Sequence, residues 1–380
     1  MADHRDRQIV IAVASPENAA HSNGIRTFLE IALLAQQQGY EVAIFPSIAE
    51  AASACQLPEA YRSLRVIQSI PANACVIVGD SISDERLAYI RSCTPRLCHY
   101  SGAPYGLFTG VYANSYRGLQ GERHAVYSPM VSTEFPYFYV QPALLELEQL
   151  ITTRSIERSH TVPKIRSKTL KICIYSGKGY LRYLPRQLRR LIRLSRSCLI
   201  TRLQPATKAD LYQVIADSDA MICFDPMTSL PYEASLLGRP CLVMSGWDEP
   251  SFLDLFPVAT DGIVFEDIDK FLSLIENGFD HTEVLAGYRR AKLENQASVS
   301  ALIAFALGED ARGTPKPPAD IASYWLSRQP FLQMLGLPSM QLPQLEMALY
   351  PYHFSDHGRR FLRRSRHLLG GLHARLRMVH

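Results

Sequence analysis

Residues 220–243 read AMICFDPMTSLPYEASLLGRPCLV, and this stretch decides the architecture of the chain. A short apolar run ends at Phe224, a polar loop follows, and a helix is predicted from Leu230. Gly238-Arg239-Pro240 then turns the chain into the next apolar strand. Strand, helix and strand in this order indicate one unit of a parallel sheet. The loop after Phe224 lies at the carboxyl end of a strand and the amino end of a helix. Open parallel sheets bind ligands there, and free backbone N–H groups favour phosphate.

The same alternation extends in both directions. In the C-terminal half of the chain it predicts strands at 171–175, 198–203, 220–224, 240–244 and 262–265, with helices at 182–196, 208–217, 230–237, 268–276 and 281–307. Toward the N-terminus it predicts strands at 8–14, 40–46, 74–79 and 96–100, with helices at 24–38 and 83–92. A polar, basic stretch at 152–169 interrupts the pattern and is predicted to be a linker. We therefore expect an N-terminal domain over 1–160, a second domain over 161–310 and a helical, basic extension over 311–380.

Length and composition place the chain among ordinary globular proteins. It has 380 residues, of which 47% are hydrophobic and 20% charged, and this length is typical of two domains. No stretch approaches the roughly 18 unbroken apolar residues of a membrane span. The polar N-terminus is not typical of a secretory signal, and the eight cysteines show no C-x-x-C pairing. We expect reduced thiols and a cytoplasmic protein.

Charge is distributed unevenly along the chain. Residues 154–208 hold fifteen Lys or Arg and one acid, and residues 358–380 hold seven Arg and no acid, although the net charge is only +4. Such blocks indicate anionic partners, or simply solvated helix faces. In 358–380 the arginines alternate with leucines, which favours an anionic membrane surface. The alternative is that this tail packs on the fold. No recognised nucleic-acid motif is present, so nucleic acid is not an expected partner.

The segment at 220–243 resembles the donor-binding motif of GT-B glycosyltransferases, especially the retaining group called family 4. In that group two acids separated by seven residues are followed by Ala and then by Gly-x-Pro. Glu233-Ala234 and Gly238-Arg239-Pro240 match, whereas Asp225 stands where the family usually has Glu. The resemblance implies an α/β fold of two Rossmann-like parallel-sheet domains facing across a cleft, with C-terminal helices.

The resemblance also implies roles for residues of this loop. Glu233 would hold the donor ribose, and Asp225 would contact the donor sugar as a catalytic residue. Thr228 and Ser229 supply hydroxyl donors at the same point and are assigned to the donor. Alternatively, Glu233 only caps its helix.

A second donor segment is predicted where the strand at 171–175 ends. Ser176-Gly177-Lys178-Gly179 follows this strand and Arg182 comes shortly after. Glycines allow the backbone to approach an anion closely, and Lys178 and Arg182 supply charge. The segment resembles the start of the second GT-B domain, where basic residues neutralise the donor diphosphate.

Two further segments complete the candidate site. Residues 15–24, SPENAAHSNG, resemble the glycine-rich loop of the first GT-B domain, so Asn23 and Gly24 are assigned to the donor and His21 and Ser22 to the acceptor. The alternative is a plain helix cap by Ser22 or Asn23. In residues 97–106, LCHYSGAPYG, His99 is the candidate for the catalytic histidine that many family members carry near the reacting sugar. Otherwise His99 is a satisfied edge residue.

These assignments predict a metal-independent, retaining glycosyltransferase. The nucleotide-sugar is its substrate, no cofactor is expected, and the acceptor is a glycan or a lipid-linked glycan. Synthesis of a surface polysaccharide at the inner face of the membrane would account for the basic tail. The alternatives are a nucleotide-sugar epimerase, a polyol-phosphate transferase, or a catalytically silent GT-B-like binding protein.

Overall fold

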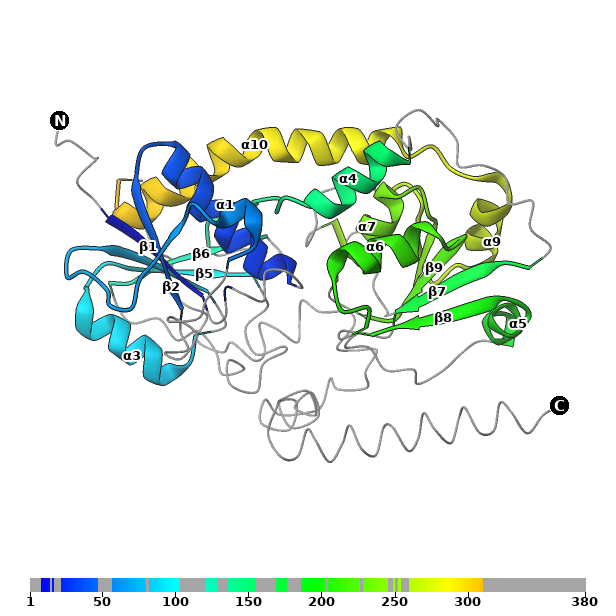
Figure 1. Cartoon of the computed structure of the whole chain (residues 1–380), viewed down its shortest axis with the longest axis horizontal. Coiled ribbons are helices and arrows are strands. Elements are labelled where there is room, and N and C mark those ends of the chain that lie inside the picture. The colour runs from blue at the N-terminus through cyan, green and yellow to red at the C-terminus, as the bar shows by residue number, and fades with distance from the viewer. Residues whose placement is uncertain are drawn as a thin grey trace. The chain divides into compact units, whose positions relative to one another are not determined.

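The protein contains two parallel β-sheets covered by helices (Figure 1). The structure is a computed structural model, and it describes residues 8–13, 16, 22–46, 57–79, 82–102, 121–128, 135–154, 169–175, 186–201, 204–225, 228–244, 249, 252–253 and 260–309. All of these residues belong to one compact unit. The predicted α/β fold with two parallel sheets is confirmed. The basic tail at 358–380 lies outside the described residues.

The first sheet has six strands in the order β3-β2-β1-β4-β5-β6, and all neighbouring pairs are parallel. Its strands are β1 (Gln8–Val13), β2 (Glu41–Pro46), β3 (Arg65–Val66), β4 (Cys75–Gly79), β5 (Leu97–Ser101) and β6 (Arg123–Val126). The sequence did not predict β3 or β6. β3 is only two residues long, and β6 begins with the polar pair Arg123 and His124, so neither has the apolar run that identified the other strands.

Helices cover both faces of the first sheet. α1 (Asn23–Gln37) packs Phe28 and Leu29 on the face formed by Ile9 and Ile11. α3 (Asp84–Cys93) packs Leu87 and Ile90 on the opposite face of the sheet. Val10 and Val76, whose side chains alternate with those of the first face, belong to this second face. A Cβ atom on Gly79 would lie 2.7 Å from Cζ of Phe28, so the absence of a side chain allows α1 to approach the sheet closely.

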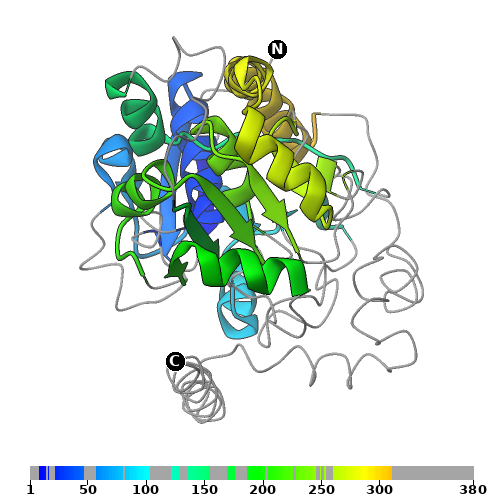
Figure 2. The same cartoon turned by 90° about the vertical axis from the view of Figure 1, so that its right-hand side faces the viewer.

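The second sheet has five strands in the order β11-β10-β9-β7-β8. Its strands are β7 (Lys171–Tyr175), β8 (Arg196–Ile200), β9 (Ala220–Cys223), β10 (Cys241–Val243) and β11 (Ile263–Phe265). Its helices are α5 (Arg186–Leu194), α6 (Lys208–Ala216), α7 (Leu230–Leu236) and α9 (Ile268–Asn277). Leu188 of α5 and Phe271 of α9 share one core with Ile172 and Ile222. Figure 2 shows α5 and α9 on the side of this sheet that faces the viewer.

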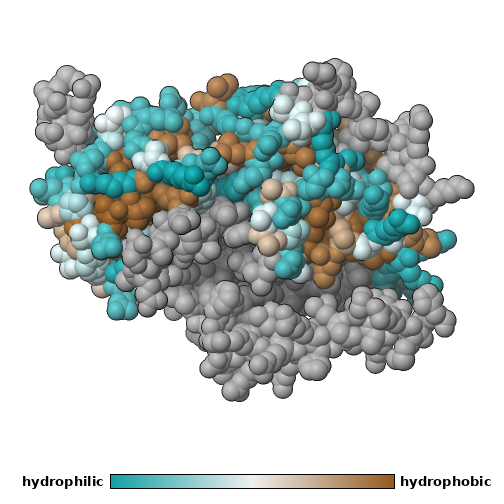
Figure 3. Space-filling view, viewed as in Figure 1, coloured by the Kyte–Doolittle hydropathy of each residue, from teal (hydrophilic) through white to brown (hydrophobic). Residues whose placement is uncertain are grey.

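Strand β8 forms an exposed edge of the second sheet. Four of its five residues are exposed, and Leu199 and the neighbouring Leu194 of α5 are among the exposed large apolar side chains. Figure 3 shows apolar patches between polar side chains on the face that it presents. All seven cysteines that the structure describes are free thiols.

Two helices join the two sheets. α10 (Thr282–Leu307) brings Tyr288 to a ring-centroid distance of 6.5 Å from Tyr232 of α7. Its last turns place Val299, Leu302 and Phe305 in the core of the first sheet. α4 (Leu145–Thr153) follows the first sheet in sequence but packs against α6 of the second. The end of α10 thus contributes to the core of the first sheet, although it follows the second sheet in sequence. The domain boundaries at 160 and 310 remain a prediction.

Among the helices of the described residues, none combines the length and the apolarity that crossing a membrane requires.

Candidate functional site

The loop between β9 and α7 carries most of the residues that the sequence assigned to the donor. β9 continues into Phe224 and Asp225, which are both buried, and α7 begins after Ser229 with proline in its first turn. Proline fits there because the first turn has no intrahelical partner for its missing N–H group. All seven residues of α7 are buried, and Glu233 is 0% exposed. The strand, loop and helix order predicted from the sequence therefore places a carboxylate in the protein interior.

The Glu233 carboxylate is the centre of a polar network. Its Oε2 atom accepts a hydrogen bond from Nζ of Lys208 at 3.1 Å. Its Oε1 atom accepts from Nδ2 of Asn23 at 2.5 Å and from the hydroxyl of Ser229. The Asn23 amide also donates to Oγ of Ser229 at 2.7 Å. Both carboxylate oxygens thus have donors, which is the condition for burying a charge without a large cost.

Burial by itself would raise the pKa of Glu233. The Lys208 ammonium and the hydrogen bonds from Ser229 and Lys208 outweigh burial and hold the pKa below its ordinary value. Glu233 is therefore an ionised acceptor at neutral pH, whether the donors belong to the protein or to a ligand.

Local structure directs Lys208 and Asn23 into this network. Lys208 is the first residue of α6, whose N-cap Thr207 accepts a hydrogen bond from the backbone N–H of Asp210. The Lys208 ammonium lies 5.2 Å from the ring centroid of Tyr212. Asn23 is the first residue of α1, and the preceding Ser22 is its N-cap, as one of the two alternatives for Ser22 predicted.

A buried ion pair fixes the start of α1. Arg26 is 4% exposed and donates from its two terminal nitrogens to the two carboxylate oxygens of Glu146, at 2.7 and 2.6 Å. Arg26 also donates to the backbone carbonyl of Ala143 at 3.4 Å. Because Arg26 is one turn after Asn23, this anchor on α4 holds the helix end that presents the Asn23 amide to Glu233.

The other predicted donor residues are placed differently. The Thr228 hydroxyl accepts a hydrogen bond from the backbone N–H of Leu230 and so helps to start α7. Gly24 is exposed, and a Cβ atom there would meet only Oγ of Ser22, at an ordinary 3.7 Å. Packing within the protein therefore does not require glycine at this position. His21, Ser176, Gly177, Lys178 and Arg182 lie outside the described residues.

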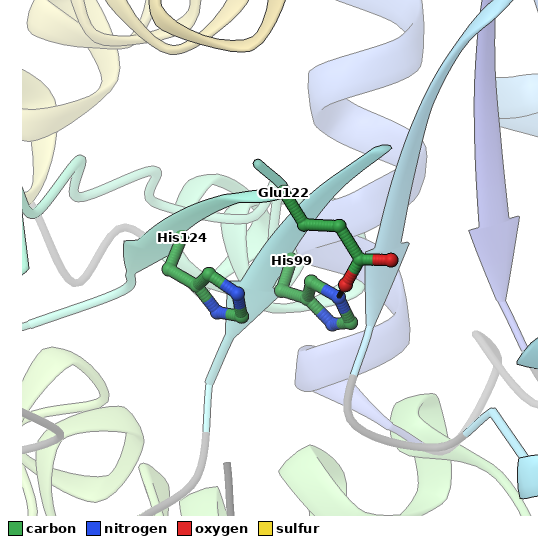
Figure 4. Close-up of side chains that lie close together, drawn as sticks. All are labelled: His99, Glu122 and His124. Atoms are coloured by element: carbon green, nitrogen blue, oxygen red, sulfur yellow. Dashed lines mark hydrogen bonds and ion pairs between the residues drawn. The ribbon is translucent and has the colours of Figure 1, made fainter. Parts of the chain in front are cut away.

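His99 belongs to a second cluster of buried polar side chains. It lies in the middle of β5 on the sheet face that α3 covers, whereas Asn23 begins the helix on the opposite face. Its Nε2 atom lies 2.8 Å from Oε2 of Glu122, and its ring stacks on His124 with 4.4 Å between centroids (Figure 4). Arg91 of α3 donates to both oxygens of Glu122, at 2.7 and 2.9 Å.

The sequence pointed to only one member of this cluster. Glu122 and His124 are two residues apart, a spacing that places side chains on the same face of a strand. His124 pairs in register with His99. The E-x-H pattern was the available signal, but it becomes meaningful only once β6 is recognised as a strand beside β5. Burial, together with the nearby charge of His99, lowers the pKa of His124 to about 2, so this imidazole is neutral at physiological pH.

Comparisons with known proteins were made for the whole chain. No protein-family model matches it, and no curated protein matches its sequence. Among solved structures it is similar to AviGT4, a glycosyltransferase involved in avilamycin A biosynthesis, with a TM-score of 0.44 and 12% identity over 82% of this chain and 100% of that one. WaaG, a glycosyltransferase involved in lipopolysaccharide biosynthesis, gives a TM-score of 0.38 and 11% identity over 81% of this chain and 97% of that one. The glycosyltransferase SnogD from Streptomyces nogalater gives a TM-score of 0.32 and 12% identity over 85% of this chain and 100% of that one. Similarities of this size establish neither a family nor an activity, and the fold described above rests on the strand order.

Proposed function

We propose that this protein is a GT-B glycosyltransferase that takes a sugar from a nucleotide-sugar donor and holds the donor ribose at Glu233. One observation carries the proposal: Glu233, in the first turns of the helix that follows β9, is bonded to Asn23, which begins the helix that follows β1. The region between the carboxyl end of a parallel strand and the next helix is where α/β proteins bind their ligands. Here the starts of two such helices, one from each sheet, meet at a single carboxylate.

The hydrogen bonds of Glu233 suggest how a ribose would bind. Its Oε1 atom accepts one N–H donor from Asn23 and one O–H donor from Ser229. The two hydroxyls of a ribose are donors of the same kind, so they would replace these partners one for one. Lys208 would keep its bond to Oε2 and hold the carboxylate ionised. Hydrogen bonds to a carboxylate are charge-assisted and hence stronger than those between neutral groups.

The remaining roles are proposed from the sequence. Lys178 and Arg182, with Ser176, Gly177 and the amino end of α7, would stabilise the departing nucleoside diphosphate. Asp225 would face the donor sugar, and His99 is kept as a candidate beside the reacting sugar. The proposed reaction is retaining and metal-independent, and the proposed acceptor is a glycan or lipid-linked glycan at the inner face of the membrane, with the tail at 358–380 on the lipid surface.

Nucleotide binding is the first test. A thermal-shift screen against nucleoside diphosphates selects the base, because a ligand that binds the native state stabilises it. Calorimetry then compares wild type with the double variant Glu233→Gln/Lys208→Met, which removes both charges of the pair together. We expect the variant to lose roughly 10–150-fold in affinity for the selected nucleotide, which corresponds to one charge-assisted interaction. Its affinity for inorganic pyrophosphate should not change, because pyrophosphate has no ribose.

A matched control separates this effect from general damage to the fold. The double variant Arg91→Met/Glu122→Gln removes the ion pair beside His99 and should bind the nucleotide as wild type does. A folded Glu233→Gln/Lys208→Met protein with unchanged nucleotide affinity would exclude the ribose role of Glu233.

Product analysis distinguishes the possible reactions. A glycosyltransferase incubated with its nucleotide-sugar alone slowly releases the nucleoside diphosphate. An epimerase changes the sugar without any acceptor, and a polyol-phosphate transferase releases a nucleoside monophosphate. A binding protein leaves every nucleotide-sugar intact, and this result would contradict the proposed enzymatic activity.

A further inference from the structure

We propose that His99, Glu122 and His124 form a binding site for a divalent transition-metal ion, with Zn²⁺ as the best-matched ion. Each residue offers one ligand atom, and these atoms all lie within 4.8 Å of one another. Figure 4 shows the three side chains on the same side of β5 and β6. This site is separate from Glu233. It gives His99 a role as a metal ligand, which is an alternative to a role beside the reacting sugar.

Backbone register brings the three ligands together. Glu122 directly precedes β6 and is two residues before His124, a spacing that places both side chains on the same face. His99 is the residue of β5 that pairs with His124 across the sheet. Two ligands are thus positioned on paired strands, which are more rigid than loops, and the third lies at the start of one of them.

The ligand chemistry suits Zn²⁺. Two imidazoles and one carboxylate occur together in zinc sites that keep a fourth position for water or substrate. The three residues are 8%, 8% and 1% exposed, and the ring of Phe135 lies 5.5 Å from that of His124. An apolar surrounding limits competition from water for the ion.

Arg91 fixes the orientation of the carboxylate ligand. Its two hydrogen bonds hold both oxygens of Glu122 in place, as supporting residues do around metal sites. The ion would take the place of the proton between Nε2 of His99 and Oε2 of Glu122, which are 2.8 Å apart, so binding releases this proton. Zinc–ligand distances of about 2.0–2.2 Å place tetrahedral ligand atoms roughly 3.3–3.6 Å apart. Nε2 of His99 and Oε2 of Glu122, at 2.8 Å, would move slightly apart, and the more distant ligand atoms, all within 4.8 Å, would move closer together. The positive charge of Arg91 opposes the ion, so we expect moderate affinity.

The test uses the full chain after removal of bound metal with a chelator. Calorimetry with Zn²⁺ should give one site per chain, and Co²⁺ should give the visible absorption of a low-coordinate complex. His124→Gln and, separately, Glu122→Gln should each weaken Zn²⁺ binding by at least about 10–100-fold, the loss seen even for residues that only support a metal ligand. His281→Gln, at a second buried histidine, is the matched control and should bind as wild type does.

Two outcomes would overturn the proposal. Wild type could show no stoichiometric Zn²⁺ binding and no Co²⁺ absorption. Alternatively, the folded His124→Gln and Glu122→Gln proteins could bind Zn²⁺ as tightly as wild type, which would assign the ion to one of the other histidines of the chain.

Discussion

Glu122 and Glu233 are both buried carboxylates with a cationic partner, but they connect different parts of the chain. The partners of Glu122 are Arg91 and His99, which are 31 and 23 residues away, on strand β5 for His99 and on α3, which covers the same sheet, for Arg91. Glu233 bonds to Lys208, Ser229 and also to Asn23, 210 residues away. Glu122 therefore secures one edge of the first sheet, whereas Glu233 links the starts of α1, α6 and α7. The second network can form only when both halves of the chain are folded.

The cations also differ in exposure. The side chain of Lys208 is 8% exposed and Glu233 is fully buried, whereas the side chain of Arg91 is 26% exposed. Water can partly hydrate a charge left behind when Arg91 is removed, but it can hardly reach the position of Lys208. We therefore expect the loss of unfolding free energy to differ between the two variants.

The largest expected effect is that of Lys208→Met. Loss of the ammonium leaves the Glu233 charge buried with neutral donors only, and breaking a buried pair in this way costs about 3–5 kcal/mol of unfolding free energy. Denaturant unfolding measures it. Arg154→Met is the control, because its partner Asp217 is 55% exposed and such pairs contribute about 1 kcal/mol or less. Equal losses in the two variants would show that Glu233 is not effectively buried.

Arg91→Met should have a smaller effect, about 1–3 kcal/mol, because Glu122 keeps its contact with His99 and lies beside a partly exposed position. The same unfolding experiment on metal-free protein gives the value. A loss larger than that of Lys208→Met would reverse the comparison and make the Glu122 cluster the more important of the two.

Acid pH provides a third comparison. The folded pKa of Glu233 is lower than its ordinary value of 4.5, so its stabilising contribution is complete above that value and is lost as pH falls through the folded pKa. The lowered pKa of Glu146 also makes the protein less stable as pH falls, whereas the raised pKa of Glu30 has the opposite effect on stability. Between about pH 5 and about pH 3, Glu233→Gln should reduce the slope of unfolding free energy against pH, by at most about 1.4 kcal/mol per pH unit. An unchanged slope would contradict the assigned direction.

Asn23→Ala should have the smallest effect on stability, about 0.5–1.5 kcal/mol, because Ser229 and Lys208 still bond to Glu233. Its effect on ligand binding is more informative. If ribose replaces the Asn23 amide, the variant should bind nucleoside diphosphate at least as tightly as wild type. Weaker binding by calorimetry would instead show that Asn23 itself contacts the donor.

The sequence predicted the parts of this molecule that depend on local pattern. The alternation in 220–243 predicted β9, the loop and α7. The family motif in that stretch selected Glu233, the hydroxyl of the loop pointed to Ser229, and the separate segment at 15–24 pointed to Asn23. Lys208 was missed because it is the last of fifteen basic residues in 154–208 and no motif distinguishes it as a side chain that points into the protein. Its direction depends on the N-cap at Thr207 and on packing against Tyr212.

The histidine cluster was missed for a different physical reason. Four residues that include Arg123 and His124 have little strand signal of their own, and β6 forms because β5 offers a free edge beside it. Likewise, periodicity predicted the helix at 281–307 but could not predict which core its last turns enter. That choice depends on long-range packing, such as the 5.8 Å ring contact of Phe305 with Phe138.

The path of α10 has a consequence for the order in which the protein is made. Domains generally fold from the N-terminus as the chain leaves the ribosome. Here the first sheet is translated by Val126, yet Leu302, Phe305 and Ala306 of its core come only at the end of α10. Until residue 307 has emerged, the face of the first sheet that receives these side chains is exposed to solvent and to chaperones. Translation of the whole second sheet must therefore finish before the first can be completed.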